Sequence, residues 1–337
     1  MRPEDHPAAP AGKVAILLIN LGSPDEPTPG AVRRYLAQFL SDRRVVEIPA
    51  LLWKPILYGA ILTTRPKASA ANYAKVWDRA ANDSPLRVNT REQAKQLEPL
   101  LGVRVDFAMR YGNPAIADRL AALKAEGFDR ILLAPLYPQY SSATTGTALQ
   151  AAFDALAAMR WMPAIATLPP YHDHPAYIAA LAASVRAQLS GLDHQPERIL
   201  LSFHGMPRRT LDLGDPYYCH CRKTARLLRA ALGMDDLSMP LAFQSRFGRA
   251  AWLQPYTEPL LRQLAADGVR RVAVLMPGFS ADCVETLEEI ALEARHSFLS
   301  AGGTHFTALS CLNATQPGMA MLARITGDML AAWRLPG

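Results

Sequence analysis

The sequence is poor in cysteine, in aromatic residues and in net charge. Its 337 residues include four cysteines, 8% aromatic side chains and a formal net charge of +6. The four cysteines lack the paired spacing of a zinc knuckle and form no disulfide framework. Lysine and arginine are spread along the chain without an arginine-rich arm, so nucleic acid is not an expected partner. An anionic small molecule or an anionic membrane surface is compatible with this mild positive charge.

The chain also lacks a long uninterrupted apolar run. The most apolar stretch, residues 48–62, is broken by Lys54 and Pro55 and is shorter than the roughly 20 apolar residues that span a bilayer. Residues 1–6 lack the apolar core of a secretion signal. We therefore expect a cytoplasmic protein. The 50% hydrophobic and 20% charged content is ordinary for globular proteins and is enough for one large or two medium domains.

Apolar, partly β-branched runs alternate with amphipathic segments along most of the chain. The runs predicted as strands lie at residues 14–18, 103–108, 131–135, 164–168, 199–203, 239–243 and 272–276, and predicted helices include 115–124, 178–189 and 255–264. This alternation predicts an α/β fold of parallel sheets covered by helices on both faces.

The two halves of the sequence resemble each other weakly. Residues 107–112, a helix and residues 127–133 match residues 243–248, a helix and residues 268–274. Residues 20–24 likewise match residues 203–207, which sets Leu21 opposite His204. We predict two similar Rossmann-like lobes, residues 1–170 and 171–337, with an active-site cleft between them where strand-end loops meet. We expect the final helix to pack back on the first lobe.

The most informative single residue is a histidine at the end of an apolar strand. His204 follows residues 199–203, so its imidazole is expected at a strand's carboxyl end, where open α/β sheets bind ligands. Gly205 permits close backbone approach and Pro207 fixes the path of the chain. An imidazole accepts protons near neutral pH or binds a borderline metal, although a lone histidine is more often structural.

An acidic helix in the second half is the next candidate. Glu285, Glu289 and Glu293 are spaced four residues apart, so on a helix they form one ridge of like charges that can conduct cations or protons. The alternative is a capping role, in which Asp282 is the N-cap and Glu285 reaches back in a capping box. The sequence leaves both interpretations open.

Other segments stand out by composition. The polar segment 137–146 follows a strand, and its hydroxyls either bind an anionic group or form ordinary turns. Arg110 and Arg246 are candidate anion clamps or helix-dipole partners. The apolar segment 51–58 has three possible interpretations: a buried helix, a lip for a flat hydrophobic ligand, or a contact with a membrane surface. The Cys-His-Cys cluster at 219–221 has too few well-placed metal ligands, and we interpret it as a surface loop.

Taken together, these motifs resemble the signature segments of the ferrochelatases. The matching segments are 17–24, 136–141, 203–207, 214–217 and 282–287, in the family's order, and the resemblance covers about residues 13 to 320. The resemblance implies insertion of Fe²⁺ into protoporphyrin IX to form protohaem, the last step of haem synthesis. It also implies a cleft between two Rossmann-like lobes.

The resemblance assigns roles to individual residues. The family's active-site histidine and glutamate correspond to His204 and Glu285, which are therefore expected as catalytic residues and as metal-site residues. Glu289 and Glu293 match further acidic positions of the metal path. The predicted porphyrin contacts are Leu21, Arg110, Tyr111, Tyr137 and Trp252, joined by Ser141 of the polar segment.

The sequence departs from the family in specific places. Cys283 stands where some members have a second histidine, a substitution associated with proteobacterial-type enzymes, and a thiol there can contact soft metals. Some members hold an iron–sulfur cluster through cysteines of a C-terminal extension, whereas residues 333–337 contain no cysteine, so we predict no cluster. We expect a monomer.

Several alternatives remain open within this resemblance. Some relatives act on coproporphyrin, although the apolar lip favours the less charged protoporphyrin. A chelatase that inserts cobalt or nickel into another tetrapyrrole and a non-catalytic porphyrin or haem carrier are the other candidates.

Overall fold

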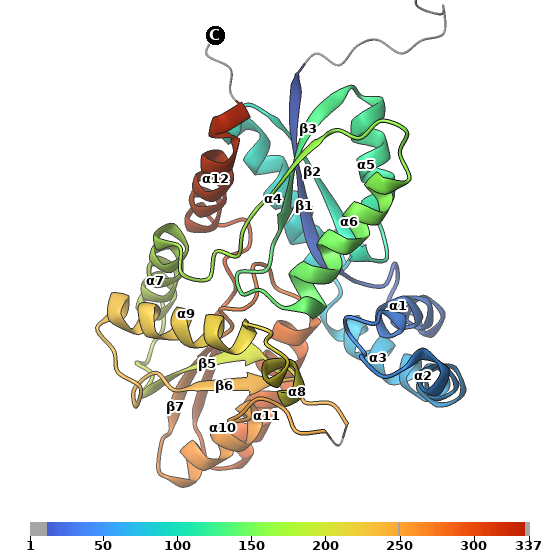
Figure 1. The fold of residues 1–337 in the computed structure, drawn as a ribbon. Helices are drawn as coiled ribbons and strands as arrows, with labels where there is room; N and C mark the ends of the chain where they lie inside the picture. The colour runs from blue at the N-terminus through green and yellow to red at the C-terminus, as the bar shows by residue number, and fades with distance from the viewer. Residues whose placement is uncertain (1–11, 249, 334–337) are drawn as a thin grey trace, which may run out of the picture.

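The computed structural model describes residues 12–248 and 250–333 (Figure 1). It contains two four-stranded parallel sheets with the same strand order. The first sheet, ordered β2-β1-β3-β4, consists of β1 (Lys13–Gly22), β2 (Arg104–Tyr111), β3 (Phe128–Pro135) and β4 (Ala164–Thr167). The second, ordered β6-β5-β7-β8, consists of β5 (Arg198–His204), β6 (Leu241–Gln244), β7 (Arg271–Leu275) and β8 (His305–Ala308). The predicted α/β class with two similar lobes is confirmed.

Helices cover both faces of each sheet, as expected for parallel strands that are apolar on both sides. The first sheet lies between α4 (Pro85–Leu101) and the pair α5 (Ile116–Ala125) and α6 (Thr147–Ala157), the last preceded by the π-helical turn η2 (Ser142–Gly146) (Figure 1). The second lies between α9 (Tyr217–Leu232) and the pair α10 (Thr257–Ala266) and α11 (Arg295–Ser300), the last preceded by the π-helix η3 (Glu285–Ala294). The short helix α8 (Arg208–Asp212) follows β5.

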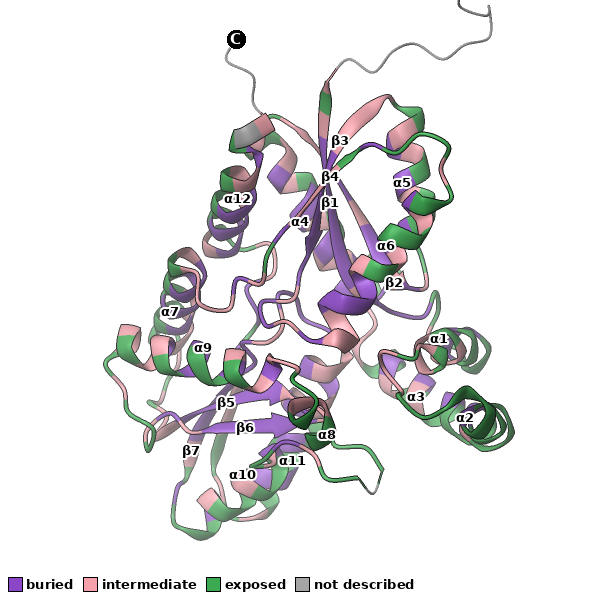
Figure 2. Ribbon diagram, in the orientation of Figure 1, coloured by how far each residue is buried: buried purple, intermediate pink, exposed green. Residues whose placement is uncertain are grey.

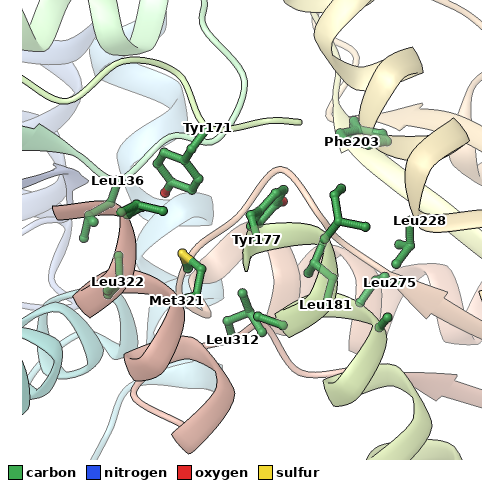
Figure 3. Packing of buried hydrophobic residues seen from close by; sticks show 14 of the residues in the cluster. Leu136, Tyr171, Tyr177, Leu181, Phe203, Leu228, Leu275, Leu312, Met321 and Leu322 are labelled. Carbon is green, nitrogen blue, oxygen red and sulfur yellow. The ribbon is translucent and has the colours of Figure 1, made fainter. Parts of the chain in front are cut away.

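The long helix that follows the last strand of each sheet packs against helices of the other sheet. Helix α7 (Pro175–Ser190) follows β4 of the first sheet but packs against α9, and α12 (Gln316–Leu330) follows β8 of the second but packs against α4 and α7. A short 3₁₀ turn, η4 (Ala331–Trp333), follows α12. One apolar cluster therefore runs through both lobes and includes Leu136, Leu181, Leu228, Leu275 and Leu322 (Figure 3).

Backbone hydrogen bonds define the true register of the internal repeat. The N–H of Met109 donates to Pro114 O and the N–H of Phe243 donates to Pro255 O, each at 2.8 Å, so Met109 and Phe243 are counterparts. The predicted match of residues 107–112 with residues 243–248 is therefore wrong by two residues. That match relied on similar amino acids, whereas the backbone hydrogen bonds of the strands define which residues of the two repeats are equivalent. The pairing of Leu21 with His204 agrees with the strand register.

Two local predictions differ from the structure. The sequence analysis did not predict β8, which is a four-residue edge strand without a buried residue. The surface loop predicted at residues 219–221 is wrong, because this segment lies within the amphipathic helix α9. Cys221 is fully buried on the inner face and Cys219 is exposed, so the helical period explains the alternation.

Three helices project beside the lobes and carry the apolar segment. They are α1 (Pro29–Ser41), α2 (Ala50–Ile56) and α3 (Leu62–Val76), with the π-helical turn η1 (Leu57–Ile61) between the last two. Trp53, Leu57 and Leu62 are buried underneath. The outer face of α2 and η1 is exposed (Figure 2). Its large exposed apolar side chains are Leu51, Leu52, Ile56 and Tyr58, which we call the apolar lip. Among the described residues, none of the helices has the length and apolar content needed to cross a membrane.

Candidate active site

His204 is the last residue of β5 and pairs with Gln244 of β6. Its Nδ1 lies 2.7 Å from the carbonyl oxygen of Gly205. Because a carbonyl only accepts, this contact assigns a hydrogen to Nδ1 and leaves Nε2 as the nitrogen that can exchange a proton with a ligand. A Cβ atom at Gly205 would lie 2.5 Å from Gln244 O, so only glycine lets the chain leave β5 along this path.

Glu285, Glu289 and Glu293 all lie on the π-helix η3. Such i→i+5 segments are rare and frequently occur at functional sites. Glu285 and Glu289 are half-buried and Glu293 is exposed, so the ridge runs from the interior to solvent. The predicted capping box is wrong. Val284 is the N-cap residue, and it makes no side-chain capping hydrogen bond. The Asp282 carboxylate instead accepts hydrogen bonds from the Thr286 hydroxyl and from the side-chain amide of Asn313.

The Glu289 carboxylate is held by the end of β6. Its Oε1 accepts from the backbone N–H of Ser245 at 2.6 Å, and its Oε2 accepts from the Ser245 hydroxyl at 2.5 Å and from Gln244 Nε2 at 3.3 Å. Burial raises the pKa of Glu289, while the Ser245 hydrogen bond and the charge of His204 lower it and Glu285 raises it further. The structure thus brings His204, Glu285 and Glu289 within electrostatic range of one another.

A narrow recess opens beside Glu285. Its walls include Gly22 at the end of β1, Ser23, Tyr73 of α3 and Cys283. Cys283 is 5% exposed, and burial raises the pKa of its thiol well above the ordinary value, with Glu285 adding to the shift. The thiol is therefore protonated at neutral pH, unlike the thiolates that bind metals.

The carboxylates predicted to form a metal path do not form a complete metal-binding site among the described residues. Within residues 12–248 and 250–333, His, Cys, Asp and Glu side chains nowhere converge in a group of three that could hold a metal ion. Glu288 faces away from this path and pairs with Lys75 of α3 at 2.6 Å.

Two of the predicted porphyrin contacts flank His204. Leu21 lies in an apolar cluster with Leu86, Phe279 and Cys283, and the Phe279 ring centroid is 6.4 Å from that of His204. Trp252 approaches Gly205 closely, since a Cβ there would lie 3.2 Å from its ring. Its indole N–H is buried without a hydrogen-bond partner, which is uncommon for a buried donor.

The other residues predicted to contact the porphyrin lie in the first lobe, and most of their polar groups form hydrogen bonds within the protein. The Asp42 carboxylate accepts from Arg110 at 2.5 Å and from the Tyr111 hydroxyl at 2.8 Å. The Ser141 hydroxyl donates to Asp215 at 3.1 Å. The Tyr137 hydroxyl, by contrast, is buried without a partner.

Burial opposes ionisation of Asp42, but hydrogen bonds from Thr147, Arg44 and Tyr111 and the charge of Arg110 keep its pKa below the ordinary value. Asp42 is therefore ionised at neutral pH and forms an ion pair with Arg110. The sequence pattern around Asp42 contained no signal for this ion pair, which joins residues 68 positions apart.

Besides the pair of Lys75 with Glu288, the projecting helices and the segment before α2 contact the second lobe through two arginines. The Arg65 guanidinium of α3 lies 4.2 Å from the ring centroid of Phe247, which follows Ser245. Glu47, just before α2, lies 3.5 Å from Arg209 of α8. These contacts join α3 and the segment before α2 to the second lobe.

Comparisons with known proteins point to one family. Residues 13–330 match the family model described as Ferrochelatase. The chain is 51% identical to a ferrochelatase of Rhizobium etli over 337 residues, covering 99% of this chain and 98% of the relative. It is also 51% identical to a ferrochelatase of Agrobacterium fabrum over 335 residues, covering 98% and 97%.

Solved structures share the fold at low sequence identity. SirB from Bacillus subtilis with Fe³⁺ aligns with a TM-score of 0.59 at 11% identity, covering 95% of this chain and 96% of that chain. CbiX, the terminal enzyme of sirohaem biosynthesis in denitrifying bacteria, aligns with a TM-score of 0.51 at 16% identity, covering 95% and 100%. Both support a chelatase-like fold.

Proposed function

The chain belongs to the ferrochelatase family, and on that premise we propose that it inserts Fe²⁺ into protoporphyrin IX in the cleft beside His204. Enzymes of this family are lyases that place a metal in a porphyrin. One observation supports these roles. The Nε2 atom of His204 is not used in the contact with Gly205, and the half-buried Glu289 nearby belongs to a row of carboxylates that ends at exposed Glu293.

Metal insertion replaces two pyrrole N–H protons with one Fe²⁺, so two protons leave per turnover. We assign their acceptance to Nε2 of His204, which is the nitrogen not committed to Gly205. Glu289 and Glu285 are the nearby carboxylates, and exposed Glu293 connects this part of η3 to water. These carboxylates serve as the path for protons leaving the site or for Fe²⁺ entering it.

The porphyrin is flat and apolar, and the walls near His204 match it. Leu21, Phe279 and Trp252 supply apolar surface, and the buried indole N–H of Trp252 has no hydrogen-bond partner within the protein. Tyr137 offers a second unpaired group in the first lobe. Candidate cations for the propionates are Arg246, which follows Ser245, and Arg65 of α3, which lies over the ring of Phe247 in the same loop.

The apolar lip is the surface that we assign to peripheral membrane contact. Leu51 is 87% exposed and Leu52 is 64% exposed, values that normally mark an interaction site when such residues are contiguous. A sparingly soluble substrate such as protoporphyrin IX is concentrated at membranes, so a lip beside the cleft would favour its capture.

An anaerobic assay tests the activity directly. Purified protein is mixed with protoporphyrin IX and Fe²⁺, and loss of porphyrin fluorescence is followed beside the His204→Ala variant. Catalytic loss in the wild type and its absence in the variant support the proposal. Porphyrin that binds to both proteins and never acquires metal identifies a carrier instead.

Two further measurements separate the remaining alternatives. Comparison of kcat/KM for protoporphyrin and coproporphyrin identifies the preferred substrate, and we expect protoporphyrin. An absorption spectrum of freshly purified protein tests the prediction that no iron–sulfur cluster is present, since a cluster adds visible charge-transfer bands.

A further inference from the structure

Ser245 has an unusual backbone conformation. Its φ of +62° lies in the left-handed region, and the other non-glycine residues there among those described are Asn82 and Asn313. Asparagine tolerates this region, whereas serine seldom occupies it. Residues held in such conformations persist only where the surroundings stabilise them, and they cluster at functional sites.

The surroundings of Ser245 show what the conformation achieves. Both its backbone N–H and its hydroxyl donate to the same carboxylate, that of Glu289, at 2.6 and 2.5 Å. Gln244 Nε2 donates to Glu289 and also to the backbone oxygen of Glu285, at 2.9 Å. The left-handed turn therefore directs two adjacent donors of one residue at a single acidic group.

A buried polar chain supports this arrangement from inside the sheet. Gln244 Oε1 accepts from the Ser202 hydroxyl at 2.8 Å, and Ser202 and Thr257 share a hydrogen bond of 2.8 Å. Gln244 is 4% exposed and Ser202 is fully buried. Because buried networks of this kind have few alternative partners, they hold their members in one geometry.

We propose that Ser245 is a positioning residue that fixes the Glu289 carboxylate beside His204 for the delivery of Fe²⁺. This inference rests on the proposed function, since the position of Glu289 matters only if the η3 carboxylates handle the metal. In this role Ser245 donates to Glu289 and acts on the metal only through that carboxylate. Gln244, the β6 partner of His204, also donates to Glu289, so this carboxylate is held at the strand end beside His204.

The test is a steady-state comparison of Ser245→Ala with the wild type, varying Fe²⁺ and protoporphyrin separately. Loss of a hydrogen bond to a charged group should lower kcat/KM for Fe²⁺ by about tenfold. The KM for protoporphyrin should change by less than about twofold, because Ser245 acts through Glu289. Ser245→Asn, which tolerates positive φ and retains a donor, should restore part of the activity.

Matched variants separate positioning from a general structural effect. Ser238→Ala removes a hydroxyl that donates to the Asp235 carboxylate, at 2.6 Å, in an exposed turn, and should leave both KM values unchanged. In a Glu289→Ala background, Ser245→Ala should cause no further loss, because its target carboxylate is gone. Ser245→Gly removes the hydroxyl without a Cβ at positive φ and serves if the alanine variant does not fold.

The outcomes are distinct. An unchanged kcat/KM for Fe²⁺ in Ser245→Ala, or an equal loss in the Glu289→Ala background, overturns the inference while the proposed function stands. Equal increases in the KM for Fe²⁺ and for porphyrin also overturn it, since they indicate a disturbed cleft. A wild-type protein that never metallates porphyrin overturns the proposed function itself.

Discussion

At the scale of single residues, burial decides which chemistry a side chain can perform. Cys283 lies beside Glu285, but its thiol is buried and its pKa is raised, so it is a neutral group in the wall of the site. Cys219 lies on the exposed face of α9. Cys221 and Cys311 are buried like Cys283.

This difference predicts the order of thiol alkylation. At neutral pH iodoacetamide should modify Cys219 first, because reaction needs an accessible thiolate and burial raises the pKa of Cys283. Peptide mass spectrometry over a time course provides the measurement. The same protein unfolded in urea is the control, in which all four cysteines should react. Early labelling of Cys283 in the native protein would contradict the burial described.

At the scale of elements, the segment of α2 and η1 has two faces with different roles. Trp53 is buried, and its indole N–H donates to Leu40 O at 2.6 Å. Leu51 and Leu52 point outward on the same short helix. The helical period therefore separates residues that stabilise the fold from residues available for binding.

The two faces should respond differently to substitution. The double variant Leu51→Asp and Leu52→Asp should keep its melting temperature but lose sedimentation with phospholipid vesicles, because its exposed apolar surface is removed. Trp53→Ala should lower the free energy of unfolding by about 3–5 kcal/mol, as is typical for a buried aromatic side chain. Calorimetry and vesicle sedimentation check both results. Unchanged vesicle binding of the double variant would reject the membrane assignment of the lip.

At the scale of the whole molecule, the exchange of α7 and α12 makes one core out of two repeats. Leu181 of α7 lies in the same apolar cluster as Leu228 of α9 and Leu322 of α12 (Figure 3). The cleft is therefore formed by lobes that share buried contacts. Separate unfolding of either lobe would expose part of this common cluster to water.

Leu181→Ala tests this shared core. The variant should lose about 2–5 kcal/mol of unfolding free energy, because a fully packed leucine is replaced by a cavity. Unfolding should remain a single transition, in which probes in both lobes change together. Urea titration followed by circular dichroism and tryptophan fluorescence gives both quantities. Two separated transitions would show that the lobes are independent.

The junction of the lobes also predicts a pH dependence of stability. The rings of His172 and His220 stack with centroids 3.6 Å apart, and burial, followed by the charge of His220, lowers the pKa of His172 to about 4. Between pH 6.5 and 4 the unfolded imidazole binds a proton that the folded one does not, so stability should fall as the pH falls through this window. Melting temperatures measured from pH 7.5 to about 4 give this slope.

A His172→Asn variant provides the control for that slope, because its side chain does not titrate. Its melting temperature should fall less steeply below pH 6.5 than that of the wild type. Identical slopes for the two proteins would mean that His172 does not contribute.

The sequence by itself determined the features that depend on local pattern. Strands such as residues 14–18 are continuous apolar runs because both faces of a parallel sheet are buried, and His204 lies at a strand end because its strand stops at glycine and proline. The spacing of Glu285, Glu289 and Glu293 placed them on one helix. The motifs also matched the ferrochelatase family, which the comparisons confirm.

Only the tertiary structure decided which of these groups have partners. Arg110 is an ordinary cation in the sequence, and its ion pair with Asp42 depends on how α1 meets β2. The sequence contains no sign of the role of Ser245. Serine rarely adopts positive φ, and the carboxylate that it binds lies 44 residues further along the chain. Local patterns follow from backbone periodicity and burial, whereas these contacts follow from the packing of distant segments, which periodicity does not encode.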